Sequence, residues 1–136
     1  MIDNIATLYK WALMGRAPLE RWNVGRVSLL GDACHPTLPM LAQGAAMALE
    51  DGFVLARALA AAGTDVEQGL ARYQDARKER TAKIVHGSAE NARRFQNRTL
   101  AEPAGAQEYV DREWSEERVK QRYEWLFTYD VTAVAV

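Results

Sequence analysis

The sequence predicts a mostly α-helical fold with one or two short strands, ending in long helices. Two observations support this: only residues 26–30 have the composition of a short buried strand, and apolar residues recur at helical spacing from residue 43 onward. The 136 residues, 49% of them hydrophobic, are enough for one domain with a core of its own. The single cysteine, Cys34, excludes a disulfide scaffold.

The first half of the chain is expected to contain little regular structure. Residues 8–14 are predicted to form a strand or the end of a short helix, which the Gly-Arg-Ala-Pro segment at 15–18 interrupts. Residues 26–30, Arg-Val-Ser-Leu-Leu, are typical of a strand buried on both faces inside a parallel sheet. Prolines and glycines exclude a regular element over residues 31–44. Because such a strand needs neighbours, the sequence is expected to be part of a larger fold.

Helices are expected in the second half. The first spans residues 43–62 and ends at Gly63, a common C-terminal cap. The second spans residues 66–98, begins with Thr64 or Asp65 and a capping-box glutamine, and has one apolar stripe. That stripe consists of Val66, Leu70, Tyr73, Ile84 and Phe95. After a linker at residues 102–105, a last helix is expected over residues 107–126.

Composition excludes several classes of protein. No apolar run approaches the roughly 18–20 residues of a membrane span, and the first residues carry an acid where a signal peptide is basic. A cytoplasmic setting without a membrane partner is therefore expected. Residues 72–98 hold eight basic and three acidic side chains. No aromatic ladder accompanies these cations, so a solvated helix face with ion pairs is favoured over a nucleic-acid site.

The segment from Gly25 to Ala62 carries the chemistry: a short strand, Gly31-Asp32, a proline-containing loop and a helix. A carboxylate at the C-terminal end of such a strand lies where ligands bind in α/β sheets, and Asp32 would accept hydrogen bonds from sugar or ribitol hydroxyls. Gly31 leaves room for a ligand near the backbone. Free amides at the start of the helix, at Gly44–Ala46, favour a flat ring that carries negative charge, as a reduced flavin does.

The same segment resembles a known family. Gly31-Asp32-Ala33-Cys34-His35-Pro36, followed by Pro39 and Gln43-Gly44-Ala45, resembles the GD motif of the group A FAD-dependent aromatic hydroxylases, which have the para-hydroxybenzoate hydroxylase fold. The segment GRVSLLGDACHPTLPMLAQGAAMALEDGFVLARAL is most similar to salicylate hydroxylases and 3-hydroxybenzoate 6-hydroxylases. The likeness covers essentially the whole chain: residues 11–13 and 16–19 precede the motif, residues 72–80 follow it, and residues 122–126 with Tyr129-Asp130 close it.

The resemblance implies that the chain binds FAD. Asp32 would hydrogen-bond the FAD ribitol next to Gly31, and Pro39 would line the flavin and the substrate. Gln43 and the amides of Gly44, Ala45 and Ala46 would face the flavin ring. No other catalytic residue and no metal ligand is implied. Such enzymes reduce FAD with NADH or NADPH and use O2 to hydroxylate a phenolic aromatic acid such as salicylate or 3-hydroxybenzoate.

The resemblance also predicts an incomplete domain. The family begins with a Gly-x-Gly-x-x-Gly unit for the ADP pyrophosphate, and no such sequence occurs here. The chain is expected to be the C-terminal part of an α/β, Rossmann-like monooxygenase fold, inactive alone. Residues 1–25 would end the substrate-domain connection, residues 26–63 would form the FAD-binding strand, loop and helix, and residues 64–136 the C-terminal helical region. The partner would be the N-terminal FAD and substrate region, and a homodimer is an open option.

Simpler interpretations exist for single residues. In isolation Asp32 could cap a turn, whereas the surrounding pattern favours a ligand contact. His35 could be a base or a metal ligand, but a structural hydrogen bond is favoured because no second histidine lies near it in sequence. Spacing alone gives Cys34 no nucleophilic character. Gln43 could contact flavin or merely begin the helix. His86 is expected to be solvated, and both Trp114 and Trp125 to lie in the core.

Two other functions stay open at this point. A small helical interaction module would use the basic helix at residues 66–98 to dock on an acidic partner, with binding that weakens as salt rises. A non-functional truncated product would be unfolded, because its strand would lack neighbours.

Overall fold

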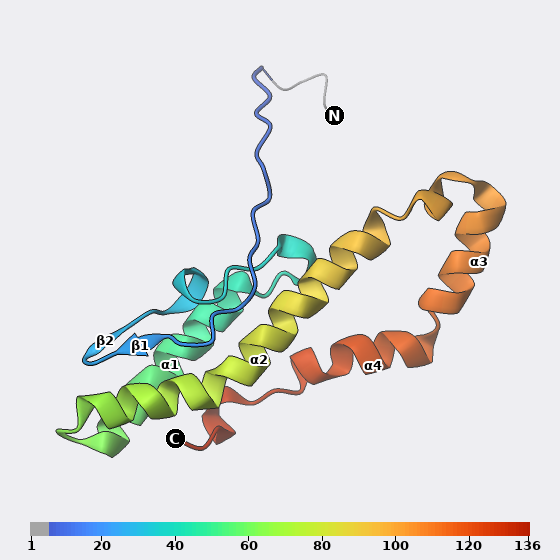
Figure 1. Cartoon of the computed structure of the whole chain (residues 1–136). Coiled ribbons are helices and arrows are strands. Elements are labelled where there is room, and N and C mark those ends of the chain that lie inside the picture. Colours follow the sequence, from blue (N-terminus) through green and yellow to red (C-terminus); the bar gives the residue numbers. More distant parts are fainter. Residues whose placement is uncertain (1–5) are drawn as a thin grey trace.

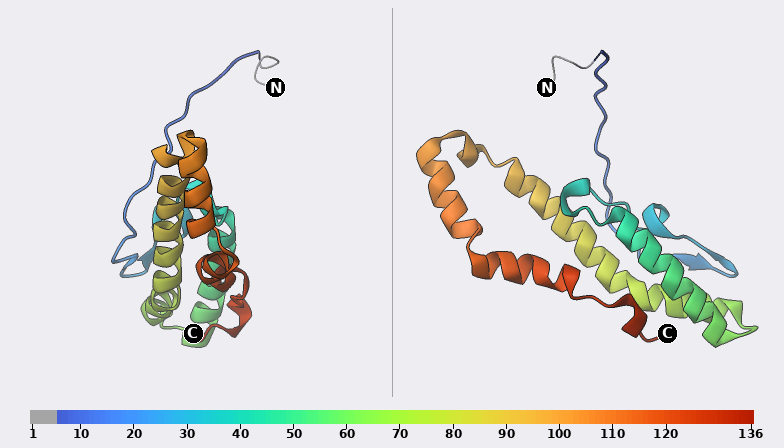
Figure 2. Two further views of the ribbon diagram at one scale, coloured as in Figure 1. Left: turned by 90° about the vertical axis from the view of Figure 1, so that its right-hand side faces the viewer. Right: turned by 180° about the vertical axis from the view of Figure 1, so that it is seen from behind.

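The computed structural model describes residues 6–136, and its main feature is a hairpin of two long helices (Figure 1). Helix α1 spans Gly44–Ala62 and helix α2 spans Val66–Phe95, and they lie side by side in all views (Figure 2). The chain returns through α3, Pro103–Glu113, and α4, Glu116–Phe127, which brings α4 back alongside α2. The prediction of a mostly α-helical fold with long helices is confirmed.

Local chemistry accounts for the sharp turn between α1 and α2. Gly63 caps α1 with a positive φ of 61°, and its N–H donates to the Leu59 carbonyl. The Asp65 carboxylate then accepts from the Gln68 N–H at 3.0 Å and so caps α2, as expected. A Cβ on Gly69 would lie 3.1 Å from the Leu59 Cα, so this glycine lets the two helices approach closely.

The core has two parts, both along the helix hairpin. The first joins Trp22 and Cys34 to Val54, Ala58 and Tyr73. The second joins Met47 and Ile84 to Leu126 of α4, with Tyr123 and Trp125 partly buried against it. In the α2 stripe, Leu70, Tyr73 and Ile84 are buried as predicted, but Phe95 is 51% exposed.

The expected strand at residues 26–30 is shorter than predicted and exposed. Strand β1, Asn23–Val24, pairs antiparallel with β2, Val27–Ser28, in a sheet of two strands within the described residues. Val27 is 70% exposed, so the expectation of a strand buried on both faces is wrong for residues 6–136. The reason is that, within residues 6–136, β1 pairs with one edge of β2 and the Val27 side chain faces solvent. Asn23 ties this small sheet to α2 by donating to the Leu70 carbonyl at 2.8 Å.

Three further expectations about elements are wrong. Residues 8–14 have no regular structure and are exposed. Helix α2 ends at Phe95 instead of continuing to residue 98. The linker expected at 102–105 is the start of α3, because a proline at a first helical position needs no amide partner.

The last expected helix, 107–126, is broken into α3 and α4. The chain turns at Trp114–Ser115, and the Glu113 carboxylate accepts from Arg118 and Arg122 across the corner. Among residues 6–136, no helix combines the length and the apolar character that a bilayer crossing requires. The expectation about a signal peptide concerns residues 1–4, which lie outside the described residues.

Candidate functional site

The Gly31-Asp32 segment forms a tight, glycine-dependent turn. Residues Gly31–Ala33 make a 3-10 turn in which the Gly31 carbonyl accepts from the amides of Cys34 and His35, at 2.9 and 3.1 Å. Gly31 has a φ of +59°, and a Cβ there would lie 3.3 Å from the Cβ of Ala48. Both observations explain why glycine occupies this position.

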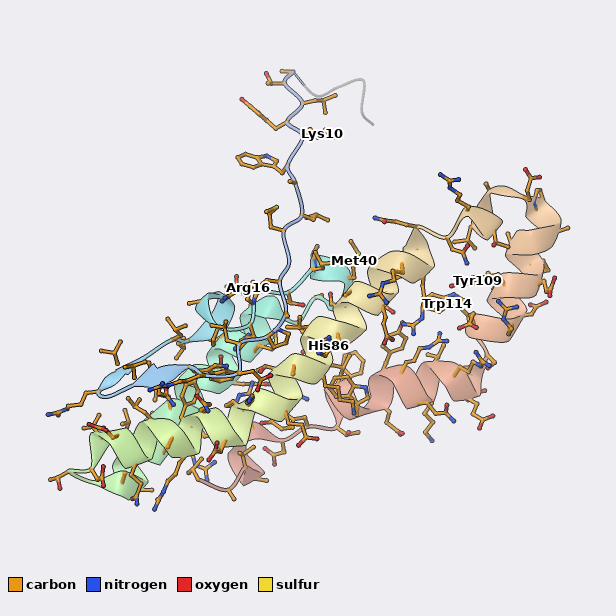
Figure 3. All side chains as sticks on the ribbon, viewed as in Figure 1. Lys10, Arg16, Met40, His86, Tyr109 and Trp114 are labelled. Carbon is orange, nitrogen blue, oxygen red and sulfur yellow. The ribbon has the colours of Figure 1, made fainter. Side chains whose placement is uncertain are left out.

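Asp32 is exposed at the outer side of this turn. Its side chain makes no hydrogen bond or ion pair within residues 6–136 and does not cap the turn. The turn-cap interpretation is therefore not supported. An exposed carboxylate without a protein partner is free to accept hydrogen bonds from a ligand. Figure 3 shows Arg16 beside the turn, where its guanidinium donates to the Ala33 carbonyl instead of pairing with Asp32.

The loop before α1 is held by α2. Pro39 is exposed in a 3-10 turn, Pro39–Leu41, which ends at Ala42 with a φ of 52°. The Ser88 hydroxyl donates to the Leu38 carbonyl, and the Asn91 amide donates to the Met40 carbonyl at 3.2 Å. Met40 is labelled at this loop, next to α2, in Figure 3. The two polar side chains thus fix the backbone on both sides of Pro39.

The N-terminus of α1 offers uncapped amides. Gln43 is the N-cap residue, but its side chain makes no capping hydrogen bond. The Gln43 carbonyl accepts the first hydrogen bond of the helix, from the Met47 N–H at 2.8 Å. Gln43 therefore begins the helix through its backbone. The amides of Gly44, Ala45 and Ala46 precede that first bond and have no acceptor within the helix. The helix dipole adds positive potential at this end, which favours an anionic group.

The turn and the helix N-terminus are neighbours in space. A Cβ on Gly31 would touch Ala48, and a Cβ on Gly44, one helical turn earlier, would lie 3.6 Å from the Thr37 side chain. The Gly31–Ala33 turn thus packs against α1 at Ala48 and Asp51, while Thr37 lies beside Gly44 at the start of the helix. A free carboxylate on the turn and free amides at the start of α1 are therefore both carried by segments that pack on the same helix, which suits an extended ligand with hydroxyl groups and an anionic edge.

A buried ion network lies directly behind the turn, and sequence reasoning missed it. The fully buried Asp51 carboxylate receives the Arg77 Nε at 2.8 Å and the His35 Nε2 at 2.6 Å. It also accepts from the Gly31 amide at 3.2 Å. Arg77, fully buried as well, continues to Glu50 at 2.6 Å and to the Tyr129 hydroxyl at 2.7 Å.

The network shifts the pKa values of its members in opposite directions. Burial raises the pKa of Asp51, but the hydrogen bonds from His35 and Arg77 outweigh burial and hold this pKa below its usual value. For His35, burial lowers the pKa, but the interactions with Asp51 and Cys34 outweigh burial and raise this pKa to about 9. His35 thus makes a structural hydrogen bond, as the sequence favoured.

The same cluster contains metal-ligand residue types. Donor atoms of Cys34, His35 and Asp51 lie within 4.8 Å of one another. The Asp51 carboxylate, however, is already engaged by the Arg77 guanidinium, whose positive charge opposes a metal cation at the same oxygens. The Cys34 thiol donates to the Gly31 carbonyl at 3.2 Å. This geometry fits a buried ion pair better than a metal centre.

Much of the basic charge on α2 is neutralised within the chain. Arg77 and Arg80 share Glu50, Lys78 pairs with Glu20, and Arg94 pairs with Glu90. Lys83 lies over the Trp125 ring at 4.0 Å. These contacts fit the interpretation of a helix face with ion pairs. His86 is exposed as expected, while Trp114 and Trp125 are only partly buried.

Comparison with known proteins supports an FAD site. A family described as "FAD binding domain" matches residues 5–88. The chain is 38% identical, over 96% of its length, to 3-hydroxybenzoate 6-hydroxylase of Polaromonas naphthalenivorans (strain CJ2), of which it covers 32%. It is 48% identical, over 67% of its length, to 6-hydroxynicotinate 3-monooxygenase of Pseudomonas fluorescens, of which it covers 24%.

A third relative is 3-hydroxybenzoate 6-hydroxylase 2 of Aquipseudomonas alcaligenes, 39% identical over 90% of this chain and matched over 38% of its own length. The chain therefore spans about a quarter to two fifths of the curated relatives that it matches. The family match includes the Gly31-Asp32 turn, the loop and the whole of α1. The chain belongs to the FAD binding domain family.

Proposed function

We propose that this chain forms part of the flavin site of an FAD-dependent monooxygenase that hydroxylates a phenolic aromatic acid with NADH or NADPH and O2. The observation that carries the proposal is the exposed Asp32, without a partner in residues 6–136, on a turn that packs against α1, whose N-terminal amides are uncapped. The substrate class is supported by the relatives' names, which specify 3-hydroxybenzoate and 6-hydroxynicotinate. Both names denote hydroxylated aromatic rings with a carboxylate.

Each residue of the site has a definite task in this proposal. Asp32 accepts hydrogen bonds from ribitol hydroxyls, and Gly31 allows the ligand to approach the backbone. The amides of Gly44–Ala46 donate to the pyrimidine edge of the flavin ring, where the helix dipole stabilises negative charge. Pro39 and the Gln43 side chain line the ring and the substrate. FAD supplies the redox and oxygen chemistry when bound, and the chain binds, orients and excludes water.

The chain has apolar faces that a larger assembly would cover. Leu49 is 78% exposed and Phe53 is 43% exposed on the outer face of α1, and Val27 is 70% exposed in the small sheet. Because each is already partly covered, its further burial would contribute less than the about 1.5–3 kcal/mol of a fully exposed side chain. In the proposed enzyme these faces pack against an N-terminal FAD and substrate region, residues 26–63 form the flavin segment, and the chain alone retains FAD weakly or not at all.

Reconstitution tests this proposal. The chain is co-expressed with the N-terminal two thirds of 3-hydroxybenzoate 6-hydroxylase from Polaromonas naphthalenivorans, and flavin absorbance is followed through gel filtration. Flavin should elute with the assembled complex and be lost with Asp32→Asn. Asp75→Asn is the matched control, because Asp75 is an exposed aspartate on α2, away from the turn. A flavin-free complex, or equal flavin retention by the Asp32 and Asp75 variants, would overturn the proposal.

A further inference from the structure

The turn that bears Asp32 is anchored from behind by one carboxylate. Oδ2 of Asp51 accepts from the Gly31 amide at 3.2 Å and lies 2.6 Å from Nε2 of His35. Gly31 directly precedes Asp32, and His35 follows it by three residues. A single buried oxygen therefore fixes both ends of the turn whose outer side carries the exposed Asp32.

No other acceptor among the described residues could replace the Asp51 carboxylate in holding the turn. Nδ1 of His35 has no hydrogen-bond partner among the described residues, so the orientation of this buried ring depends on its bond to Asp51 and on packing. Packing comes from Trp22, whose ring centroid lies 5.4 Å away at a tilt of 52°. Without the Asp51 oxygen, the Gly31 amide and the imidazole would both be buried donors without an acceptor.

The anchor is itself held by the neighbouring helix. Oδ1 of Asp51 accepts from Nε of Arg77, so α2 fixes the carboxylate on the side opposite the turn. Asp51, His35 and Arg77 are all fully buried. A substrate therefore cannot reach them directly, and they can act on a ligand only by shaping the turn.

We propose that Asp51 is the positioning residue of the flavin turn: through Gly31 and His35 it sets the backbone conformation that presents Asp32 to FAD. The inference rests on the proposed function and extends it to a residue that does not touch the cofactor. It gives the buried Asp51 carboxylate a function, although burying a charge by itself destabilises the fold.

Two neighbouring carboxylates allow a matched test in the reconstituted complex. Asp51→Asn keeps the shape but has one acceptor oxygen, so it cannot serve the turn and Arg77 together. Glu50→Gln removes a carboxylate that binds Arg77 and Arg80 but makes no contact with the turn. Both variants lose an ion pair with the same arginine, so both should lower the urea midpoint. Only Asp51→Asn should weaken FAD binding, by about 10- to 100-fold, as expected for lost hydrogen bonds to a charged group.

The outcomes separate this inference from the proposed function. If wild-type complex holds no flavin, the proposed function fails. If wild type binds FAD and both variants weaken binding in proportion to their loss of stability, Asp51 is merely structural and the inference is overturned. Should Asp51→Asn not fold, hydrogen exchange on the wild-type chain decides. The Gly31 amide must exchange as slowly as helix amides, and exchange as fast as that of the exposed Gly25 would refute the anchor.

Discussion

Replacement of Arg77 by methionine should strongly destabilise the chain. Arg77 is fully buried and binds three partners, Asp51 at 2.8 Å, Glu50 at 2.6 Å and the Tyr129 hydroxyl at 2.7 Å. Methionine fills a similar volume but leaves Asp51 with a buried negative charge that only His35 and one amide offset. The substitution therefore removes the attraction between Arg77 and Asp51, and the free energy of burying the Asp51 charge is no longer offset.

The size of the effect follows from this geometry. Three charge-assisted hydrogen bonds at about 1.5–3 kcal/mol each give an upper limit for the loss of stability. The actual loss is smaller, because the variant no longer has to bury the charge of Arg77. Breaking a buried pair by removing one partner typically costs about 3–5 kcal/mol, and we expect this value here. It is a large share of the roughly 5–15 kcal/mol that a domain has in total.

Urea unfolding followed by far-ultraviolet circular dichroism measures this loss. Arg118→Met is the control, because Arg118 binds Glu113 at 2.9 Å with its side chain 46% exposed and should cost under about 1 kcal/mol. The double variant Asp51→Asn with Arg77→Met should lose less than the sum of the two single losses. Equal midpoints for Arg77→Met and Arg118→Met would show that the buried Arg77 contacts contribute no more than an exposed ion pair.

Two further predictions follow from the turn. The His35 imidazole should titrate near pH 9 in NMR spectra; since its folded pKa lies above the unfolded value, its stabilisation is complete at acidic pH below about 6.5 and is lost as pH rises through 9. A midpoint near 6.5 would contradict the bond to Asp51. Gly31→Ala should cost about 1–2 kcal/mol, because φ is +59° and Ala48 is close, whereas Gly52→Ala, in open space within α1, should stabilise by about 0.5–1 kcal/mol. Equal thermal midpoints for the two variants would show that the turn is not strained.

The helix hairpin and the place of the turn were predictable because their causes are local. Gly63 and Asp65 end one helix and begin the next by backbone conformation and a capping bond, which sequence alone specifies. That Gly31 leaves room for a ligand stays a prediction, because in the structure its positive φ and the nearby Ala48 already account for the glycine. The caps at Gly63 and Asp65 depend only on neighbouring residues, so the sequence predicts them.

Contacts between residues far apart in the sequence could not be predicted from local sequence patterns. The apolar run at residues 26–30 predicted a buried strand, but burial depends on a covering layer, which local pattern cannot supply. The Arg77–Asp51 pair joins residues 26 positions apart, and neither spacing nor composition specifies it. One indication was available: Arg77 follows Leu70 and Tyr73 at helical spacing, so it continues the apolar stripe to which α1 packs.

Helix α1 combines a buried charge with exposed apolar side chains. It buries the charged Asp51 while Leu49 and Phe53 stay 78% and 43% exposed on other faces. Hydrophobic burial alone would favour the opposite arrangement. The inversion is consistent with a helix that is enclosed on all sides in the proposed enzyme, where apolar faces pack outward and the inner carboxylate organises the turn. In the proposed enzyme, the buried charge and the exposed leucine have one explanation: α1 links the turn proposed to bind flavin to the rest of the fold.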